Sequence, residues 1–497
     1  MKYHQLETLS TSLSPEEFFK TYISKRQPVK IKGLPEDESF KARAWTDLNH
    51  LAEKAGDSQV LIEPMHPESH QFGTDVERIK VSFRDFLQSL QDDEGPHHYL
   101  TTQYADVDLD EHTVVPPPAD VLTDDYPSVP RIMGNLSPQQ VNLWVGRSEE
   151  GSTSGLHHDF HDNLYCLLRG RKRFILYPPE EVHNMYPYGT LEVIHDNGSI
   201  SYLDAPVRPD GLTIRGGLKA RVKAIEQKLE AVPIGKGKGR RDTKERKILL
   251  KAYDDALDEL AQYTLEAGDG VEVEDEVDDF DALMASLEEE SSEDLADIDD
   301  DAESDDDENE DEDEEDEETE EEDGEDEGDE EVDDEAEETG QDMLLDDEET
   351  ESSEPPSFSR IPTALVHQHL GLPTTAVVPP GASNDFPNLQ KTSAPYVVEL
   401  NAGEMLYLPA AWWHEVTSYS SADDPQPIHM AFNYWLYPPT NLDDFDDPYE
   451  DTLIWDYFRS EQNKEHTPKE DVPVINTKRK GGDVDESKNR ESKRSRV

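Results

Sequence analysis

The sequence predicts an all-β core with flanking helices, which is an α+β fold, and a long insertion that interrupts the β-domain. Short strand-like runs follow one another closely between Val141 and Pro179, and such spacing indicates a barrel or a sandwich. Strand-like sequence resumes after Pro355, whereas residues 208–354 lack this pattern. An exposed loop tolerates a long insertion because the entropic cost of closing a loop grows only logarithmically with its length. We therefore expect both strand-rich blocks to form one β-domain.

Residues 1–130 predict a mixed α/β region that flanks the barrel. Ser14 to Glu17 has the features of a helix start, with Ser as the N-cap, Pro in the first turn and Glu three residues after the cap. Pro28 to Lys32 alternates like a half-buried strand, and Tyr99 to Tyr104 is also strand-like. Val81 to Leu90 places its apolar residues at helical spacing, which predicts a helix.

Residues 131–207 and 355–460 predict the first and second parts of the barrel. Both segments contain short runs rich in β-branched and aromatic residues, and turn residues such as Gly170 and Gly403 separate them. The strands that we expect are Val141–Val145, Asn163–Leu168, Arg171–Tyr177, Tyr396–Leu400, Glu404–Leu408 and Ile428–Leu436.

The first part of the insertion, residues 208–268, is basic and predicts helices. Residues 206–251 hold 14 Lys or Arg against 5 Asp or Glu. Leu218–Val232 and Thr243–Ala267 combine helical periodicity with good helix formers. We expect a turn or a flexible loop between them, at Gly235–Arg241.

The second part of the insertion, residues 269–354, is an acidic tract. It holds 53 of the 117 acidic residues and no Lys or Arg. Self-repulsion and a shortage of apolar residues predict that it is disordered. A solvated spacer is the simplest interpretation of the tract. The alternative is an interaction segment that attracts basic partners or the basic helices before it.

Composition excludes several classes of protein. The formal net charge is −72, and the chain outside the acidic tract still carries −19, so we expect no direct nucleic-acid binding, which requires clustered cations. The single cysteine, Cys166, excludes a disulfide framework and a thiolate zinc finger. Met1 to Leu13 has no apolar signal core, and the sequence contains no run of about 18 apolar residues. We therefore expect a protein that is neither secreted nor inserted in a membrane.

The last segment, residues 461–497, predicts a disordered basic tail. It contains two basic clusters, Lys478–Lys480 and Lys493–Arg496, whose spacing is similar to that of a bipartite nuclear import signal. A solvated tail without an import function is the alternative. The expected location is the nucleus, the cytoplasm or both.

The pattern His-x-Asp at His157 and Asp159 predicts a metal site. On a strand, residues i and i+2 point to the same face, so both side chains can reach one ion. His414 is the candidate for a third ligand, and two histidines with one carboxylate are the ligands of non-haem Fe(II) oxygenases. His158 and His161 are nearby competitors, and any one of the 17 histidines taken alone is more simply a surface or hydrogen-bonded residue.

Several motifs together provide the context for this pattern, and the chain resembles the Jumonji C (cupin-like) Fe(II)- and 2-oxoglutarate-dependent oxygenases. The similarity is greatest to the small Jumonji C lysyl hydroxylases, and it covers residues 1–205 and 355–440. The motifs that carry it are Thr153–Asp159, Asn163–Cys166, Gly170–Phe174, Pro178-Pro179, Ala402–Pro409 and Trp412–His414.

The resemblance implies a double-stranded β-helix, the jelly-roll or cupin barrel of two sheets, with the metal in its mouth. It implies that His157, Asp159 and His414 bind Fe(II), that 2-oxoglutarate and O₂ are co-substrates, and that no other side chain acts as an acid or base. The positions that match the co-substrate-binding residues of the family are Lys172, Ser154, Tyr99, Asn163 and Asn433. Lys172 would bind the far carboxylate of 2-oxoglutarate, and Thr153 lies one place from the matched hydroxyl position.

Three functions follow from these observations. The first is hydroxylation of a protein side chain, lysyl in the first instance, by the Fe(II) chemistry. The second is demethylation of histone lysine by the same chemistry, and the third is a non-catalytic protein that binds partners through its acidic tract. We expect a protein substrate, for which a basic nuclear or translation-related protein is one candidate, and a homodimer is one assembly to consider. The loops that would contact a substrate vary within a fold, so the motifs do not identify it.

Overall fold

The structure is a computed structural model that describes residues 2–10, 12–66, 72, 76–92, 95, 97–103, 115–148, 151–232, 244–266, 355–374, 376–421, 424 and 426–465. The predicted loop at 235–241, the acidic tract and residues 466–497 of the predicted tail lie outside the described residues. One compact unit consists of Met1–Ala261 and Glu354–Val497. A second unit consists of Gln262–Ser353, of which only residues 262–266 are described.

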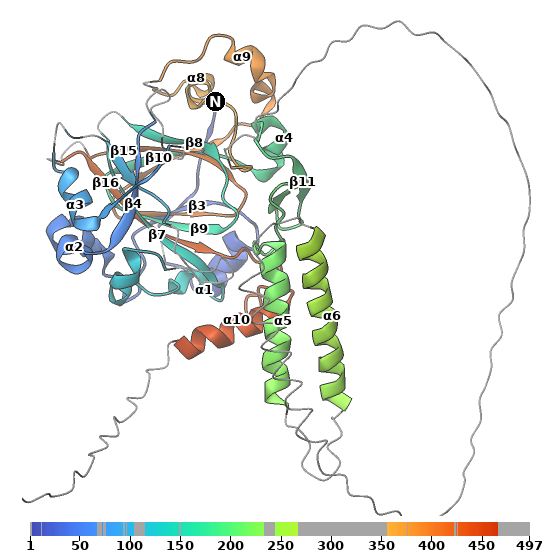
Figure 1. Cartoon of the computed structure of the whole chain (residues 1–497). Coiled ribbons are helices and arrows are strands. Elements are labelled where there is room, and N and C mark those ends of the chain that lie inside the picture. The colour runs from blue at the N-terminus through green and yellow to red at the C-terminus, as the bar shows by residue number, and fades with distance from the viewer. Residues whose placement is uncertain are drawn as a thin grey trace, which may run out of the picture. The chain divides into compact units, whose positions relative to one another are not determined.

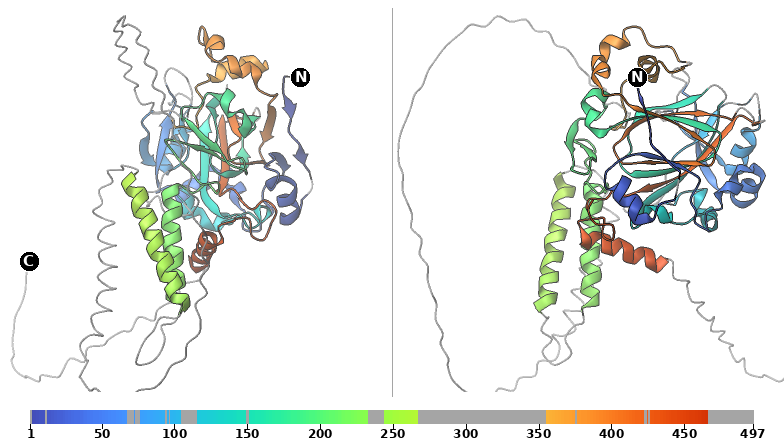
Figure 2. Two further views of the ribbon diagram at one scale, coloured as in Figure 1. Left: turned by 90° about the vertical axis from the view of Figure 1, so that its right-hand side faces the viewer. Right: turned by 180° about the vertical axis from the view of Figure 1, so that it is seen from behind.

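Two large sheets form the centre of the fold, and they face each other in Figures 1 and 2. The five-stranded sheet contains, in spatial order, β1 (His4–Gln5), β13 (Tyr396–Asn401), β10 (Arg171–Tyr177), β15 (Trp413–Tyr419) and β8 (Ser152–His157). The nine-stranded sheet contains β2 (Thr8–Leu9), β3 (Val29–Lys32), β14 (Glu404–Leu408), β9 (Asp162–Arg169), β16 (Ile428–Leu436), β7 (Pro138–Arg147), β6 (His98–Leu100), β4 (Gln59–Pro64) and β5 (Ile79–Ser82). A separate hairpin pairs β11 (Leu191–Ile194) with β12 (Ile200–Tyr202).

Strands from before and after the insertion alternate within both sheets. In the nine-stranded sheet β9 lies between β14 and β16, and in the five-stranded sheet β10 lies between β13 and β15. All of these pairs are antiparallel, whereas β1 and β2 join the sheets through parallel pairing. The two strand-rich blocks of the sequence therefore share the same two sheets.

Helices cover the outer faces of the sheets and extend from them, which confirms the predicted α+β class. The α-helices in the described part of the chain are α1 (Pro15–Phe18), α2 (Leu48–Ala55), α3 (Phe83–Ser89), α4 (Val182–Met185), α5 (Ile214–Ala231), α6 (Lys244–Glu266), α8 (Thr363–Leu370), α9 (Ala382–Asp385) and α10 (Thr452–Glu465). No helix of this part of the chain is long and apolar enough to cross a membrane.

Alternation along the strands divides the apolar residues into three clusters. Leu167, Phe174 and Leu406 belong to a cluster between the two sheets. Their neighbours along the chain point outward, so that Cys166 packs with residues of α1, α2 and α3, and Ile175 packs with residues of α4 and α8. The central strands β9 and β10 are therefore buried on both faces, and the inner face is the one that can line a site.

The predicted local structure is confirmed at several elements and shifted at others. Ser14 caps α1 and exchanges hydrogen bonds with Glu17, as the capping box requires. The helix predicted from Val81 begins only at Phe83, because Val81 and Ser82 belong to β5. The strand predicted for Tyr99 to Tyr104 covers only His98–Leu100, and β4 was not predicted.

The two long helices of the basic insertion are described up to residue 266. The Arg221 guanidinium of α5 lies 2.9 Å from the Glu259 carboxylate of α6. On another side of α5, the Gln227 amide donates a hydrogen bond of 3.0 Å to the Ser460 hydroxyl of α10. The insertion thus leaves the barrel through a helix that contacts the C-terminal helix.

Candidate metal centre

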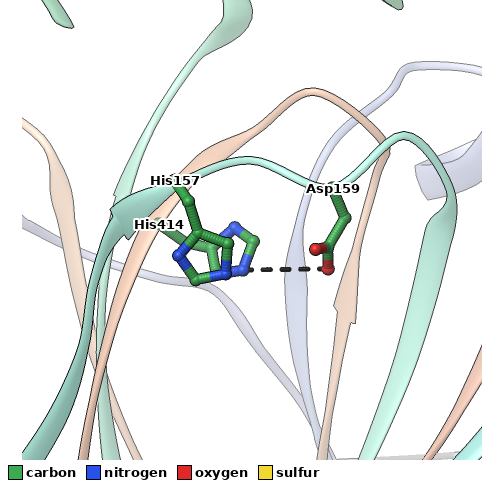
Figure 3. A group of neighbouring side chains, drawn as sticks. All are labelled: His157, Asp159 and His414. Atoms are coloured by element: carbon green, nitrogen blue, oxygen red, sulfur yellow. Dashed lines mark ion pairs between the residues drawn. The ribbon is translucent and has the colours of Figure 1, made fainter. Parts of the chain in front are cut away.

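His157, Asp159 and His414 converge at one edge of the five-stranded sheet (Figure 3). His157 ends β8 and pairs with His414 of β15 in antiparallel register. Their potential ligand atoms all lie within 4.8 Å of one another, and Nε2 of His414 is 3.8 Å from Oδ2 of Asp159. In the described part of the chain, no other group of three His, Cys, Asp or Glu side chains is arranged in this way.

Asp159 reaches this site by a route that differs from the expected one. The strand ends at His157, so the alternation of a strand does not place Asp159 beside it. The chain bends instead, and the Asp159 carbonyl accepts a hydrogen bond of 2.8 Å from the Ala411 amide, close to His414 in sequence. The bend that follows β8 and the turn that precedes β15 thus fix each other.

Both histidines present Nε2 as the free ligand atom. Nδ1 of His157 lies 3.2 Å from the Gly155 carbonyl oxygen, and Nδ1 of His414 lies 2.9 Å from the Trp412 carbonyl oxygen. A carbonyl oxygen only accepts, so Nδ1 carries the proton in both rings and Nε2 keeps its lone pair. Burial, and then the neighbouring His414, lowers the pKa of His157 to about 4, which favours the neutral ring that binds a metal.

A chain of hydrogen-bond donors ends on the Asp159 carboxylate. The Trp435 indole N–H donates to Oδ2 of Asp159 over 3.2 Å, and the Asn163 amide lies 3.5 Å from the same oxygen. The Asn433 amide donates to Oδ1 of Asn163 over 3.0 Å, and Trp144 donates to Oδ1 of Asn433 over 2.8 Å. Asn163 and Asn433 therefore help to orient the carboxylate, and Asn163 also lines the cavity next to the triad.

A buried ion pair holds the turn that precedes His414. The Asp162 carboxylate accepts two hydrogen bonds from Arg26, of 2.8 and 2.6 Å, one from the Tyr407 hydroxyl at 2.7 Å and one from the Ala410 amide at 2.9 Å. The Trp412 indole donates to the Arg26 carbonyl over 3.0 Å. Asp162 thus links Arg26, Tyr407 and Ala410, which lie in different parts of the chain. These charge-assisted hydrogen bonds restrict the movement of the turn.

The triad opens onto a cavity of about 70 Å³ inside the barrel. Tyr99, Ser154, Asn163 and Lys172 also line it, so the structure brings most of the predicted co-substrate residues together with the triad. Asn433 contacts this group through Asn163.

Lys172 is a buried cation at this cavity, with 1% of its surface exposed. Its ammonium donates a hydrogen bond of 2.9 Å to the Tyr99 hydroxyl, and it lies 5.4 Å and 5.5 Å from the ring centroids of Tyr99 and Tyr165. Desolvation lowers the pKa of Lys172 to about 7. A negatively charged ligand in the cavity would supply the counter-charge that these neutral neighbours do not.

The two candidate hydroxyls differ in their contacts. The Thr153 hydroxyl donates a hydrogen bond of 2.6 Å to Oε1 of Glu415. The Ser154 hydroxyl makes only a long contact of 3.4 Å with the Gly155 carbonyl. Ser154 is therefore the hydroxyl more readily available to a ligand.

The competing histidines point elsewhere. Nε2 of His158 lies 2.7 Å from the Tyr202 hydroxyl, and the His158 ring packs against Trp413. The His161 ring packs against Tyr437. Neither ring joins the triad.

Phe358 forms a wall of the site that the sequence did not indicate. Its ring stacks on His157 with 4.9 Å between centroids and 19° between planes, and the two residues form a β-bridge. Phe358 follows the insertion directly, so motif spacing gave no reason to place it next to residue 157. Trp435 was also missed, because an aromatic residue in a strand is usually a packing residue.

Comparison with known proteins agrees with this geometry. The cupin-like domain family matches the chain over residues 15–441. The chain is 33% identical over 456 residues to JmjC domain-containing protein 4 of Schizosaccharomyces pombe. This alignment covers 89% of this chain and 86% of that protein. It is 26% identical over 204 residues to Lysine-specific demethylase JMJ32 of Arabidopsis thaliana, covering 37% and 53% of the two chains. It is 30% identical over 150 residues to Jumonji C domain-containing protein 5 of Drosophila melanogaster, covering 29% and 34%.

Proposed function

The chain belongs to the cupin-like family of JmjC proteins, and from this premise we propose that it is an Fe(II)- and 2-oxoglutarate-dependent dioxygenase that hydroxylates a protein side chain, lysyl in the first instance. The observation that carries the proposal is the joint presence of the His157–Asp159–His414 triad and the buried Lys172 at one cavity. The order of strands supports the double-stranded β-helix that such enzymes use.

The donor atoms of the triad fit Fe(II). Two neutral imidazole nitrogens and one carboxylate suit a borderline divalent metal, and three protein ligands leave other coordination positions for co-substrates. When bound, Fe(II) with 2-oxoglutarate and O₂ supplies oxidative decarboxylation to succinate and CO₂ coupled to hydroxylation of an unactivated C–H bond.

The residues of this chain then have distinct tasks. Lys172 and Tyr99 bind the far carboxylate of 2-oxoglutarate, with Ser154 as a further donor, because a basic side chain and a hydroxyl already lie together in a buried part of the cavity. Trp435 and Asn163 hold the Asp159 carboxylate in one orientation. The apolar interior between the sheets excludes water from the reaction.

Demethylation of a lysyl N-methyl group is the second candidate, because one similar protein is named a lysine-specific demethylase. It would use the same triad and the same co-substrates. A non-catalytic binding protein is the less economical hypothesis, since a binder has no need for a complete set of metal ligands beside a buried lysine.

The test combines succinate formation with mass spectrometry. The full chain is incubated with Fe(II), 2-oxoglutarate, O₂ and a pool of basic proteins. The peptides are then searched for a mass increase of one oxygen atom, which indicates hydroxylation, or a mass decrease of CH₂, which indicates that hydrogen has replaced an N-methyl group. We expect oxygen gain on lysyl residues together with succinate. His157→Ala and Asp159→Ala should abolish both while the protein stays folded, whereas His183→Ala, at an exposed histidine of α4, should abolish neither. Turnover by either triad variant would refute the site.

A further inference from the structure

His429 is a buried polar side chain inside the barrel to which the proposed chemistry gives no role. It lies on β16, where residues alternate between the inner and outer faces. Asn433 and Trp435 share its face, and at the metal end Trp435 donates to Asp159 whereas Asn433 donates to Asn163. His429 precedes Trp435 by six residues, or roughly 20 Å along the strand. It therefore lies at the opposite, inner end of the barrel.

His429 packs against Tyr99 and lies within reach of the charge of Lys172, and these are the two residues that we assign to the far carboxylate. Its ring meets the Tyr99 ring edge-on, with 5.3 Å between centroids and 66° between planes. Burial, and then the charge of Lys172, holds the pKa of His429 well below its ordinary value, so the ring is neutral. A neutral imidazole carries one N–H donor and one acceptor.

Neither ring nitrogen of His429 has a hydrogen-bond partner among the described residues, although both atoms are fully buried. Gly146 leaves the space in which the ring lies, since a Cβ there would be 3.0 Å from Cε1 of His429 and 2.6 Å from Cδ2 of Tyr99. Buried polar groups are almost always satisfied, and an apolar side chain would fill this position without loss. The two nitrogens therefore call for a polar partner, and the ring lies against Tyr99, which lines the cavity.

We propose that His429 recognises the co-substrate: its ring lies behind Tyr99, outside the lining of the cavity, and its N–H reaches the far carboxylate of 2-oxoglutarate through one ordered water, beside Lys172 and Tyr99. This inference rests on the proposed function and names a residue that selects a dicarboxylate. A carboxylate offers about four acceptor sites, so the lysine and the tyrosine leave room for a third donor. A neutral donor also suits this position, because a second cation beside Lys172 would lower the pKa of Lys172 further and favour its uncharged form.

The test compares two 2-oxo acids that differ only at the far end. The full chain is loaded with Fe(II) in the absence of oxygen and titrated calorimetrically with 2-oxoglutarate or with 2-oxopentanoate, which lacks the far carboxylate. His429→Leu and His429→Met should bind 2-oxoglutarate about tenfold or more weakly, the loss typical of a hydrogen bond to a charged group. Both should bind 2-oxopentanoate within about twofold of the unaltered chain, and His429→Gln, which keeps an N–H donor, should retain most of the affinity for 2-oxoglutarate.

The outcomes separate recognition from packing. Equal weakening of both 2-oxo acids, or no weakening of either, overturns the inference. An unaltered chain that binds neither compound in the presence of Fe(II) overturns the proposed function and this inference with it. If both apolar variants fail to fold, ring ¹⁵N resonances of the unaltered, Zn(II)-loaded chain decide. The two resonances that are missing from the spectrum of His429→Gln belong to the ring of His429. They should shift when 2-oxoglutarate binds and not when 2-oxopentanoate binds. If 2-oxoglutarate leaves both resonances unchanged, the assignment is overturned.

Discussion

Binding of 2-oxoglutarate should be coupled to protonation of Lys172. The pKa of this buried lysine is lowered from 10.5 to about 7 by desolvation, so the ligand-free protein loses the proton as the pH rises through 7. A bound carboxylate stabilises the ammonium and raises the pKa again. Above pH 7 the complex therefore holds a proton that the free protein lacks, and affinity must fall as the pH rises.

The magnitude follows from the pKa. At pH 8 about 90% of the free protein lacks the proton, so each binding event should take up about 0.9 proton, and affinity should be about tenfold weaker than at pH 6. The carboxylates of the co-substrate stay ionised between these values. Deprotonation of Lys172 in the free protein thus predicts both the direction and the size of the change in affinity for 2-oxoglutarate.

Calorimetry in two buffers of different ionisation enthalpy measures this uptake directly. The Fe(II)-loaded chain is titrated without oxygen at pH 6, 7 and 8, and Lys172→Met serves as the control. The variant should bind on the order of a hundredfold more weakly, because the carboxylate loses its buried counter-charge, and it should take up no proton. A pH-independent affinity for the unaltered chain, or equal uptake by the variant, would refute the role of Lys172.

Three further outcomes are expected. Asp162→Ala should lower the free energy of unfolding by about 3–5 kcal/mol in urea denaturation, because it leaves Arg26 buried without its carboxylate, and a loss below ~1 kcal/mol would contradict this reasoning. Trp435→Phe should weaken metal binding about tenfold by removing a donor to the carboxylate of the triad, whereas Trp45→Phe, which removes an indole donor to the Asp125 carboxylate outside the triad, should not. Deletion of residues 269–354 should leave turnover of a short peptide within about twofold, since the triad and the residues that line the cavity all lie outside this range. Loss on peptides would place the tract in the active site, and loss only on a large basic protein would indicate docking.

The sequence predicted the parts of the site that lie within short motifs. His157, Asp159 and Lys172 belong to two neighbouring runs whose residues remain neighbours in space. His414 was found because a second run of similar quality surrounds it. Tyr99 was matched at long range and does contact Lys172.

The residues that were missed contribute contacts between distant parts of the chain. Arg26 pairs with Asp162 across 136 positions, and neither residue carries a local signal for the pairing. Phe358 reaches His157 only because the chain returns from the insertion along the edge of β8. His429 resembles any strand histidine until the register of β16 turns it inward beside Tyr99. Such contacts depend on register and topology, which local periodicity does not contain.

The alternation of early and late strands has a consequence for synthesis on the ribosome. About 220 residues separate the end of β10 from the start of β13, which pairs with it. At roughly 5–20 residues per second, β10 waits some 10–40 s for β13. During this interval β9 and β10 expose unpaired edges and apolar faces, which are the features that promote aggregation and attract chaperones. The length of the insertion thus sets how long the nascent chain depends on protection.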